Sequence, residues 1–224
     1  MDSPRFTRRL LVFAIGVPLA WAVLLWFHPD VGPDDVYADL RDEVTTYVIV
    51  HVGTLVFIGL MGVALYLLVR GLPGRAAQIS RLAIGPFVLF YAAWESVIGL
   101  AIGVLAQHAN DAPARQRPAV ADAIQSLGES AIVGEAGVLV SVGAISWVVA
   151  VIAAAVAYRG LGAPAPAVIL LGLSVLVVSH PPPIGPIGLA CFAAAVALLA
   201  RHERLSMAPY AAAPVPPPGL GARA

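Results

Sequence analysis

Long apolar runs recur along the chain, separated by short polar or proline-rich segments. They cover residues 10–27, 45–69, 82–106, 130–157, 161–180 and 183–200. Each is close to the ~20 residues that a helix needs to cross a hydrocarbon core of ~30 Å. The runs are uninterrupted rather than one-sided, which excludes a protein that only lies on a membrane surface. The pattern predicts an all-α integral membrane protein, a bundle of six transmembrane helices within residues 1–204.

The last two runs are short and are crowded by six prolines. A re-entrant hairpin that enters the membrane from one side also leaves on that side, so residues 161–200 fit either two spans or such a hairpin. The first run follows basic residues, as a signal peptide would, but its length and the spans after it indicate a retained anchor. Residues 205–224 are rich in proline and alanine, and we expect a disordered cytoplasmic tail there.

The arginines orient the predicted bundle. Ten of them fall on one side of a six-span arrangement, and only Arg41, Arg115 and Arg117 fall on the other. The arginine-rich side is expected to face the cytoplasm, which places both termini there in a multi-pass protein of the plasma membrane. Most acidic residues gather on the opposite, outer side.

Composition then excludes several classes of protein. The chain is 60% hydrophobic and only 12% charged, whereas soluble domains are about a quarter charged. All 13 basic residues are arginine, which excludes a lysine Schiff base and hence a retinal protein. Cys191 is the single cysteine, so no disulfide can form within the chain. The net charge is zero and the chain has no block of basic residues, so we expect no nucleic acid as a partner. The expected partners are the lipid bilayer and an apolar small molecule.

Glu95 lies near the middle of the third predicted span, where an ionisable side chain is costly and therefore a functional candidate. The same helix face carries, at four-residue spacing, Phe87, Tyr91, Glu95, Gly99 and Gly103. Together with Trp94 and Ser96 beside the acid, this stripe predicts a pocket wall. The alternative is that the two glycines mark a helix contact and Glu95 is only a hydrogen-bonded link between helices.

His51 is the second candidate, in the outer third of the second span and one turn from Tyr47. Three other histidines, His28, His108 and His180, also fall in the outer half. Four on one side suggest a metal or haem site, although no two share a helix at metal-binding spacing. We assign no metal ligands from the sequence.

Glu129 and Glu135 form the third candidate, at the outer end of the fourth predicted span. Six residues apart on a helix they would point about 120° from each other, so at most one faces a given pocket. Glu135, between Gly134 and Gly137, is the expected inward one. An outer-half cavity around these candidates would have the apolar, sparsely polar walls of a small-molecule site.

A resemblance adds to this interpretation. The blocks HVGTLVFIGLMGVALYLLVRGLPGRAA (51–77) and FYAAWESVIGLAIGVLAQHAN (90–110) resemble small multi-span membrane proteins of actinobacteria. Chain size, predicted topology and a buried acid are also similar to the membrane-bound terpene cyclases of meroterpenoid pathways. That resemblance implies cyclisation of an isoprenoid without a cofactor, started by a proton from a buried acid. The DDxxD pattern that binds diphosphate in soluble cyclases is absent from this sequence.

Three classes of function therefore remain open. In a cyclase, Glu95 is the general acid, His51 or Glu135 sets its proton state, and Phe87, Tyr91, Trp94, Ser96 and Tyr47 bind substrate. In a proton-coupled carrier, the same carboxylates form a relay. In a metal or haem protein, the outer histidines are ligands.

Overall fold

The apolar runs fold as helices, because a helix satisfies every backbone polar group within its own segment. We describe residues 6–32 and 34–211 in a computed structural model, and these residues contain no β-strand. The elements are α1 (Arg8–Leu25), α2 (Val36–Leu40), α3 (Val44–Val69), α4 (Arg75–Glu95), the π-helical η1 (Ser96–Ala101), α5 (Ile102–Asp111), α6 (Arg117–Gly128), α7 (Val138–Gly160), α8 (Ala165–Leu173), the 3₁₀-helical η2 (Ser174–Val178) and α9 (Ile184–Ala211).

Five helical stretches in the described part of the chain are long and apolar enough to cross a bilayer. They are α1, α3, the continuous stretch α4–η1–α5, α7 and α9 up to Leu205. The remaining apolar helix, α8–η2 (Ala165–Val178), is shorter than the ~20 residues of a full span. The chain is therefore a multi-pass membrane protein by the length and composition of its helices.

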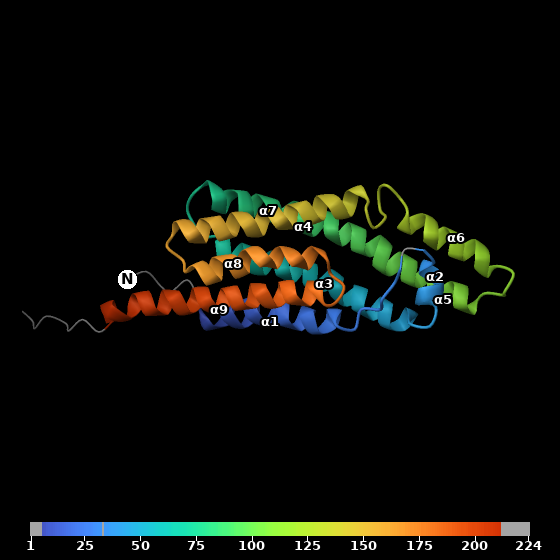
Figure 1. The fold of residues 1–224 in the computed structure, drawn as a ribbon, viewed down its shortest axis with the longest axis horizontal. Helices are drawn as coiled ribbons and strands as arrows, with labels where there is room; N and C mark the ends of the chain where they lie inside the picture. The colour runs from blue at the N-terminus through green and yellow to red at the C-terminus, as the bar shows by residue number, and fades with distance from the viewer. Residues whose placement is uncertain (1–5, 33, 212–224) are drawn as a thin grey trace, which may run out of the picture.

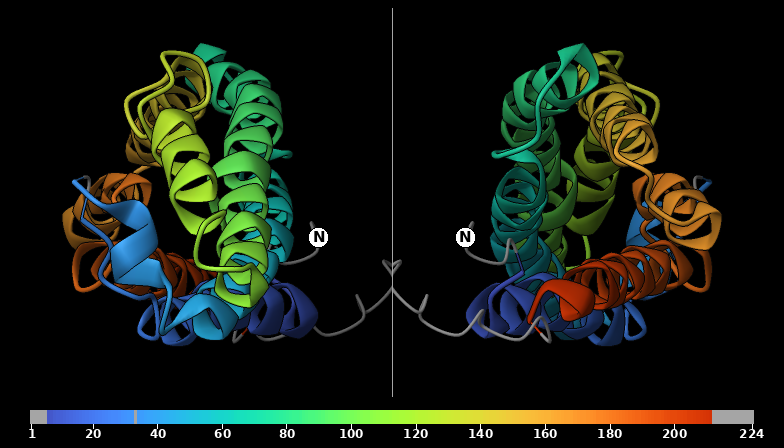
Figure 2. Two further views of the ribbon diagram at one scale, coloured as in Figure 1. Left: turned by 90° about the vertical axis from the view of Figure 1, so that its right-hand side faces the viewer. Right: turned by 90° about the vertical axis from the view of Figure 1, so that its left-hand side faces the viewer.

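The long helices and α8 are arranged as a ring (Figures 1 and 2). Along this ring α1 packs on α3, α3 on α4, α4 on α7, α7 on α8, α8 on α9, and α9 returns to α1. Large side chains fill its interior, among them Trp21, Phe87, Trp147 and Phe192, all fully buried. Phe87 and Phe192 both pack against Trp147, with ring centroids 4.8 and 6.2 Å away. The interior of the ring is thus a packed core.

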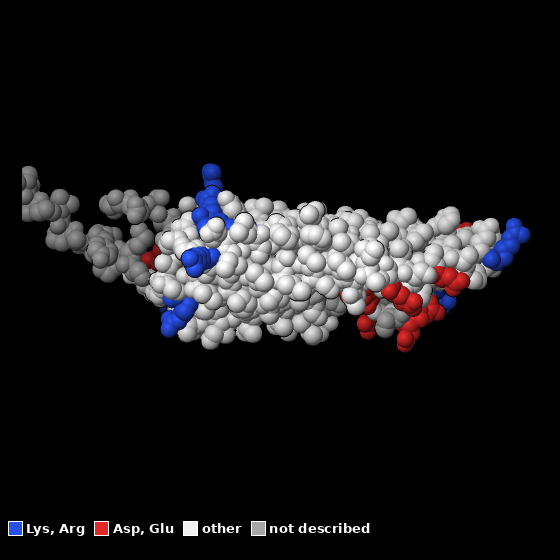
Figure 3. All heavy atoms as spheres, turned by 90° about the horizontal axis from the view of Figure 1, so that it is seen from above, with Lys and Arg blue, Asp and Glu red and all other residues white. Residues whose placement is uncertain are grey.

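Charge separates the two ends of the bundle (Figure 3). One end, which we call the arginine end, carries Arg8, Arg9, Arg70, Arg75, Arg81, Arg159, Arg201 and Arg204. The other, the acidic end, holds the loop after α1, α2, the end of α5 and α6, and with them Asp30, Asp34, Asp35, Asp39, Asp42, Glu43, Asp111 and Asp122. A few arginines, Arg41, Arg115 and Arg117, lie in the same segments, and blue side chains are seen at this end in Figure 3. The face between the two ends in Figure 3 is free of charged side chains. The first and last described helices, α1 and α9, begin and end respectively at the arginine end.

A small cap covers the acidic end. The stretch α4–η1–α5 continues past the end of α1 and meets α2 and α6 there (Figure 1). The Tyr37 hydroxyl of α2 donates to the side-chain oxygen of Asn110 on α5 at 2.9 Å, and the Asn110 amide donates to the Arg41 carbonyl at 2.7 Å. These bonds fix the cap to the bundle, because they join segments that are far apart in the sequence.

Several predicted boundaries are wrong. The fourth span begins at Val138 rather than at residue 130, because residues 129–137 form tight turns. The third runs from Arg75 to Asp111, well beyond 82–106. Glu95 follows Arg75 by twenty residues and precedes Asp111 by sixteen, so it lies near the middle of this longer stretch, as predicted.

The tail expected from residue 205 also begins too early, since α9 continues to Ala211. Residues 212–224, the remainder of that expected tail, lie outside the described residues. Arg5 and Arg223, which entered the predicted charge asymmetry, lie outside them as well.

Candidate functional site

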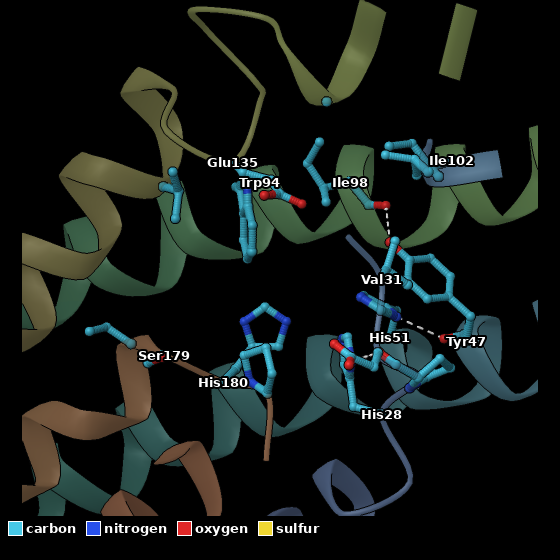
Figure 4. Close-up of a pocket in the computed structure, with 17 residues that line it drawn as sticks. His28, Val31, Tyr47, His51, Trp94, Ile98, Ile102, Glu135, Ser179 and His180 are labelled. Carbon is cyan, nitrogen blue, oxygen red and sulfur yellow. Dashed lines mark hydrogen bonds between the residues drawn. The ribbon is translucent and has the colours of Figure 1, made fainter. Parts of the chain in front are cut away.

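Three histidines from three separate segments meet at the acidic end of the bundle (Figure 4). His28 lies in the loop after α1, His51 lies two turns into α3, and His180 lies between η2 and α9. The ring of His28 is 4.9 Å from that of His51 and 5.0 Å from that of His180, measured between centroids. One ring nitrogen of each lies within 4.8 Å of those of the other two. Such a group has the composition of a metal site.

The Nδ1 atom of each histidine already has a partner. Nδ1 of His51 is 2.8 Å from the Tyr47 carbonyl, and Nδ1 of His28 is 2.7 Å from the Pro29 carbonyl. A carbonyl can only accept, so both Nδ1 atoms carry the proton. This anchoring sets the tautomer and orients the ring, as in metal-bound histidines.

His180 follows the same pattern through a tyrosine. The Tyr91 hydroxyl donates to the Val178 carbonyl at 3.2 Å, so its oxygen is left to accept from Nδ1 of His180, 3.5 Å away. In all three rings Nε2 is then the nitrogen with a free lone pair. For His28 this Nε2 is buried and has no hydrogen-bond partner among the described residues.

Burial favours the neutral form of the two histidines in the connecting segments. Burial lowers the pKa of His28, although the Pro29 carbonyl and nearby Asp30 oppose the shift. The pKa of His180 is also well below the usual value, because of burial and then because of its two histidine neighbours. A neutral imidazole is the form that binds a metal, so these rings are prepared as ligands near neutral pH.

Glu95 lies beside this group. Its side chain is fully buried, and Oε1 is 3.8 Å from Nε2 of His51. Neither carboxyl oxygen has a hydrogen-bond partner in the described part of the chain. A buried carboxyl group without hydrogen bonds is costly and is retained mainly where it has a function.

The helix changes its winding immediately after Glu95. The π-helical segment Ser96–Ala101 widens the turn, which is a common feature of functional sites. The Tyr47 hydroxyl reaches across from α3 and donates to the Ile98 carbonyl of this segment at 2.7 Å. Tyr47 therefore supports the site twice, through its hydroxyl on η1 and through its carbonyl on His51.

Gly99 provides the space for the His51 ring. A Cβ atom on Gly99 would lie 2.6 Å from Cγ and 2.7 Å from Cβ of His51, closer than atoms in contact can be. A Cβ on Gly103 would similarly lie 2.6 Å from a methyl group of Val48. The two glycines thus mark a close contact between α3 and the α4–η1–α5 stretch, as the alternative interpretation of the stripe expected.

A cavity of about 350 Å³ opens next to the three histidines. Figure 4 shows the histidines on one side and Trp94, Ile98 and Glu135 on the other. The full lining is His28, Pro29, Asp30, Val31, Val36, Tyr47, His51, Trp94, Ile98, Ile102, Gly128, Glu135, Val140, Val178, Ser179, His180 and Pro181. The cavity has the size of a small-molecule site. Its lining contains more polar residues than the sparsely polar walls that we expected from the sequence.

The predicted site residues divide into two groups. His51, Glu135, Tyr47 and Trp94 line the cavity, with Glu95 next to His51. Three of the expected substrate-binding residues do not line it. Phe87 and Tyr91 are buried in the core, where their rings lie 5.8 Å apart between centroids. Ser96 is exposed, and its hydroxyl donates back to the Ala92 carbonyl.

The geometry predicted for Glu129 and Glu135 is wrong. Neither residue lies within the fourth span, so the 120° argument does not apply. Glu135 lines the cavity from the turns before α7, but its side chain is exposed rather than turned into the bundle. Glu129, at the end of α6, accepts a hydrogen bond from Gln125 at 2.8 Å.

From the sequence, His28 and His180 enter only as outer histidines of the metal or haem alternative, not as residues of the cavity. The available signal was the repeated His-Pro dipeptide at span ends, which places both residues at one level of the bundle. The fourth outer histidine, His108, is exposed on α5 and does not belong to the group.

The chain was compared with known proteins by sequence and by structure. No family model, curated protein or solved structure matches it.

Proposed function

We propose that this protein is a multi-pass protein of the plasma membrane with a transition-metal centre at its acidic end, held by His28, His51 and His180. The observation that carries the proposal is the convergence of three ring nitrogens within 4.8 Å of one another. The anchored Nδ1 atoms add to it, because each leaves Nε2 as the donor atom.

The spacing of the nitrogens suits a small ion. Three points at most 4.8 Å apart lie at most about 2.8 Å from their centre, and zinc–nitrogen bonds are about 2.0–2.1 Å. A shift of about 0.7 Å per nitrogen therefore closes the site around zinc. A haem is disfavoured, because rings in contact at 4.9 and 5.0 Å leave no gap for a macrocycle between them.

The donor set favours zinc or a similar borderline ion. Imidazole nitrogens suit zinc, copper, iron and nickel, whereas hard ions such as calcium prefer oxygen. Three protein ligands with a cavity alongside are typical of catalytic zinc sites, in which water or substrate takes the fourth position. The metal centre is accordingly proposed to be catalytic.

The charge separation orients the site. Arginines are retained on the cytoplasmic side of membrane proteins, so the arginine end faces the cytoplasm and the metal centre faces outward. With α8–η2 counted as a short sixth crossing, both termini are cytoplasmic.

Metal analysis of the purified protein tests the proposal. Detergent-solubilised protein dialysed against excess zinc should keep about one zinc per chain, and cobalt in its place should give the visible absorption of a tetrahedral site. His28→Ala, His51→Ala and His180→Ala should each lose most of the metal. His108→Ala, which removes an exposed histidine of α5, should keep it. Wild-type protein that retains no metal, or the same loss in His108→Ala, would contradict the proposal.

A second candidate is the proton-initiated terpene cyclase, with Glu95 as general acid. The fully buried, unpartnered carboxyl group and Trp94 at the cavity favour it. A metal-free preparation should then cyclise a prenylated epoxide, and Glu95→Gln should abolish turnover. Normal turnover by a folded Glu95→Gln protein excludes this candidate. Dependence of turnover on zinc would favour the metal centre instead.

A further inference from the structure

The cavity lies at the level where a membrane protein meets lipid headgroups. His28 follows the end of α1 and His180 precedes the start of α9, so the histidines lie where these two apolar helices terminate. Beyond them the cap and the acidic residues begin (Figures 1 and 3). A molecule bound in this cavity can keep an acyl chain beside the apolar band while its polar end reaches the metal centre.

The lining of the cavity has the same two-sided character. Val31, Val36, Ile98, Ile102 and Val140 supply apolar walls around the polar group. The volume of about 350 Å³ holds the reactive end of an amphiphile rather than the whole of a long-chain lipid. An amphiphilic substrate that enters partway fits both the size and the lining.

The charged residues that line the cavity indicate which kind of amphiphile it can bind. Asp30 and Glu135 line the cavity, and no arginine does so among the described residues. Sites for phosphate esters normally provide arginine, lysine or helix N-termini to bind the phosphate oxygens. Two carboxylates repel such an anion, so a neutral carbonyl compound is the better match.

The backbone at Glu135 is held by its loop. The Glu135 amide donates to the Gly128 carbonyl at 3.1 Å, and the Gly137 amide donates to the Gly134 carbonyl at 2.9 Å. A Cβ on Gly134 would lie 2.5 Å from the Ser130 carbonyl oxygen, so the turn cannot be wound this tightly without glycine. The side chain of Glu135 is exposed, on a loop whose backbone is constrained, and it lies across the cavity from three potential zinc ligands (Figure 4). A carboxylate at the mouth of a metal site can act as a general base.

From these observations we infer that the protein is a metal-dependent hydrolase of a neutral acyl ester or amide in an amphiphile, with Glu135 as the base. This inference rests on the proposed metal centre. His28, His51 and His180 would hold the metal, which would supply a Lewis acid that acidifies a water molecule beside it, and Glu135 would take one proton from that water. The hydroxide so formed would attack the carbonyl carbon, the bond to the alcohol oxygen or amine nitrogen would break, and Glu135 would return its proton to that leaving group. One water is consumed, and a carboxylic acid and an alcohol or amine are formed.

Chromogenic substrates test the reaction on zinc-loaded protein in detergent. p-Nitrophenyl octanoate or N-octanoyl-p-nitroanilide should be hydrolysed, and p-nitrophenyl phosphate should not. Glu135→Gln should lower kcat about 100-fold or more with little change in KM, since a general base contributes 10²–10⁴ in rate. Glu129→Gln is the matched control, because Glu129 lies six residues away, outside the cavity lining, and it should retain full activity.

The metal content of each sample separates the two proposals. Protein that holds zinc yet hydrolyses neither acyl substrate overturns the hydrolase and leaves the metal centre standing. Protein that holds no zinc overturns the metal centre itself. Faster turnover of the phosphate, or unchanged kcat in Glu135→Gln, also overturns the inference. If Glu135→Gln does not fold, Glu135→Asp, which withdraws the carboxylate by one methylene group, must still lower kcat at least tenfold.

Discussion

The contact between Gly99 and His51 allows a sharp test of the metal centre from outside the ligand set. In Gly99→Ala the new methyl group would lie 2.6 Å from Cγ of His51, whereas ordinary contacts begin near 3.4 Å. Cδ2 of the ring lies closer still, so the ring must move by more than about 0.8 Å or the two helices must separate, and overpacking of this kind costs about 1–3 kcal/mol. Nδ1 of His51 is anchored to the Tyr47 carbonyl at 2.8 Å, so a displacement forced by the methyl group weakens the bond that orients the ring.

The expected result is a large loss of metal affinity together with a stability loss of about 1–3 kcal/mol. Metal–ligand distances tolerate only about ±0.2 Å, so a His51 ring that the methyl group keeps from closing on the metal ceases to be a ligand. We expect zinc to bind at least 100-fold more weakly, which corresponds to about 2.7 kcal/mol. Competition with a chromophoric chelator measures the affinity, and thermal unfolding in the same detergent measures the stability.

Gly85→Ala is the matched control, because a Cβ on Gly85 of α4 has no neighbour within 4 Å. Alanine is the better helix former, so this variant should be as stable as wild type or slightly more stable, with unchanged zinc affinity. A Gly99→Ala protein that binds zinc like wild type would refute the packing argument and the assignment of His51 as a ligand.

Three further predictions concern stability. Tyr47→Phe should lower the free energy of unfolding by about 0.5–1.5 kcal/mol, because it removes the hydrogen bond from the Tyr47 hydroxyl to the Ile98 carbonyl. Zinc affinity measured by chelator competition should change only a few-fold, since the Tyr47 carbonyl remains. Metal-free protein should become less stable as the pH falls below about 6.5. The pKa values of His28 and His180 are lowered in the folded state, so the unfolded chain takes up protons first as the pH falls. Thermal unfolding measured between pH 7.5 and 5 should show the free energy of unfolding decrease by up to about 1.4 kcal/mol per pH unit for each histidine. A stability that does not change with pH would contradict this. Gly143→Ala should be more destabilising than Gly85→Ala, because a Cβ on residue 143 would lie 2.8 Å from a backbone nitrogen of α4. Backbone atoms cannot move aside as a side chain can. Equal melting temperatures of the two variants would contradict this prediction.

The amino-acid sequence by itself determined the membrane character of this protein. Uninterrupted apolar runs and very few charges leave a bundle of long helices as the only way to satisfy the backbone in lipid. Five such helices and the charge-free band between two charged ends follow from that pattern. The local sequence also singled out His51 and Glu95, because polar side chains within apolar runs are conspicuous.

Helix boundaries that depend on neighbouring segments could not be predicted from the sequence as reliably. The fourth span begins at Val138 because Gly134 and Gly137 allow tight turns before it, and hydropathy does not register backbone geometry. The length of the third span was also underestimated. The α4–η1–α5 stretch extends past the ends of α1 and α9 into the cap, and the polar residues at its two ends do not show in hydropathy as part of one helix.

Only the tertiary structure decided which polar residues form a site. His28, His51 and His180 are separated by 23 and 129 residues along the chain, and helix periodicity relates residues only within one helix. Their meeting depends on the ring closed by α9 against α1, which brings the loop after α1 next to the turn before α9. The same closure leaves Phe87 and Tyr91 in the core and turns Ser96 outward, although all three lie on the helix that carries Glu95.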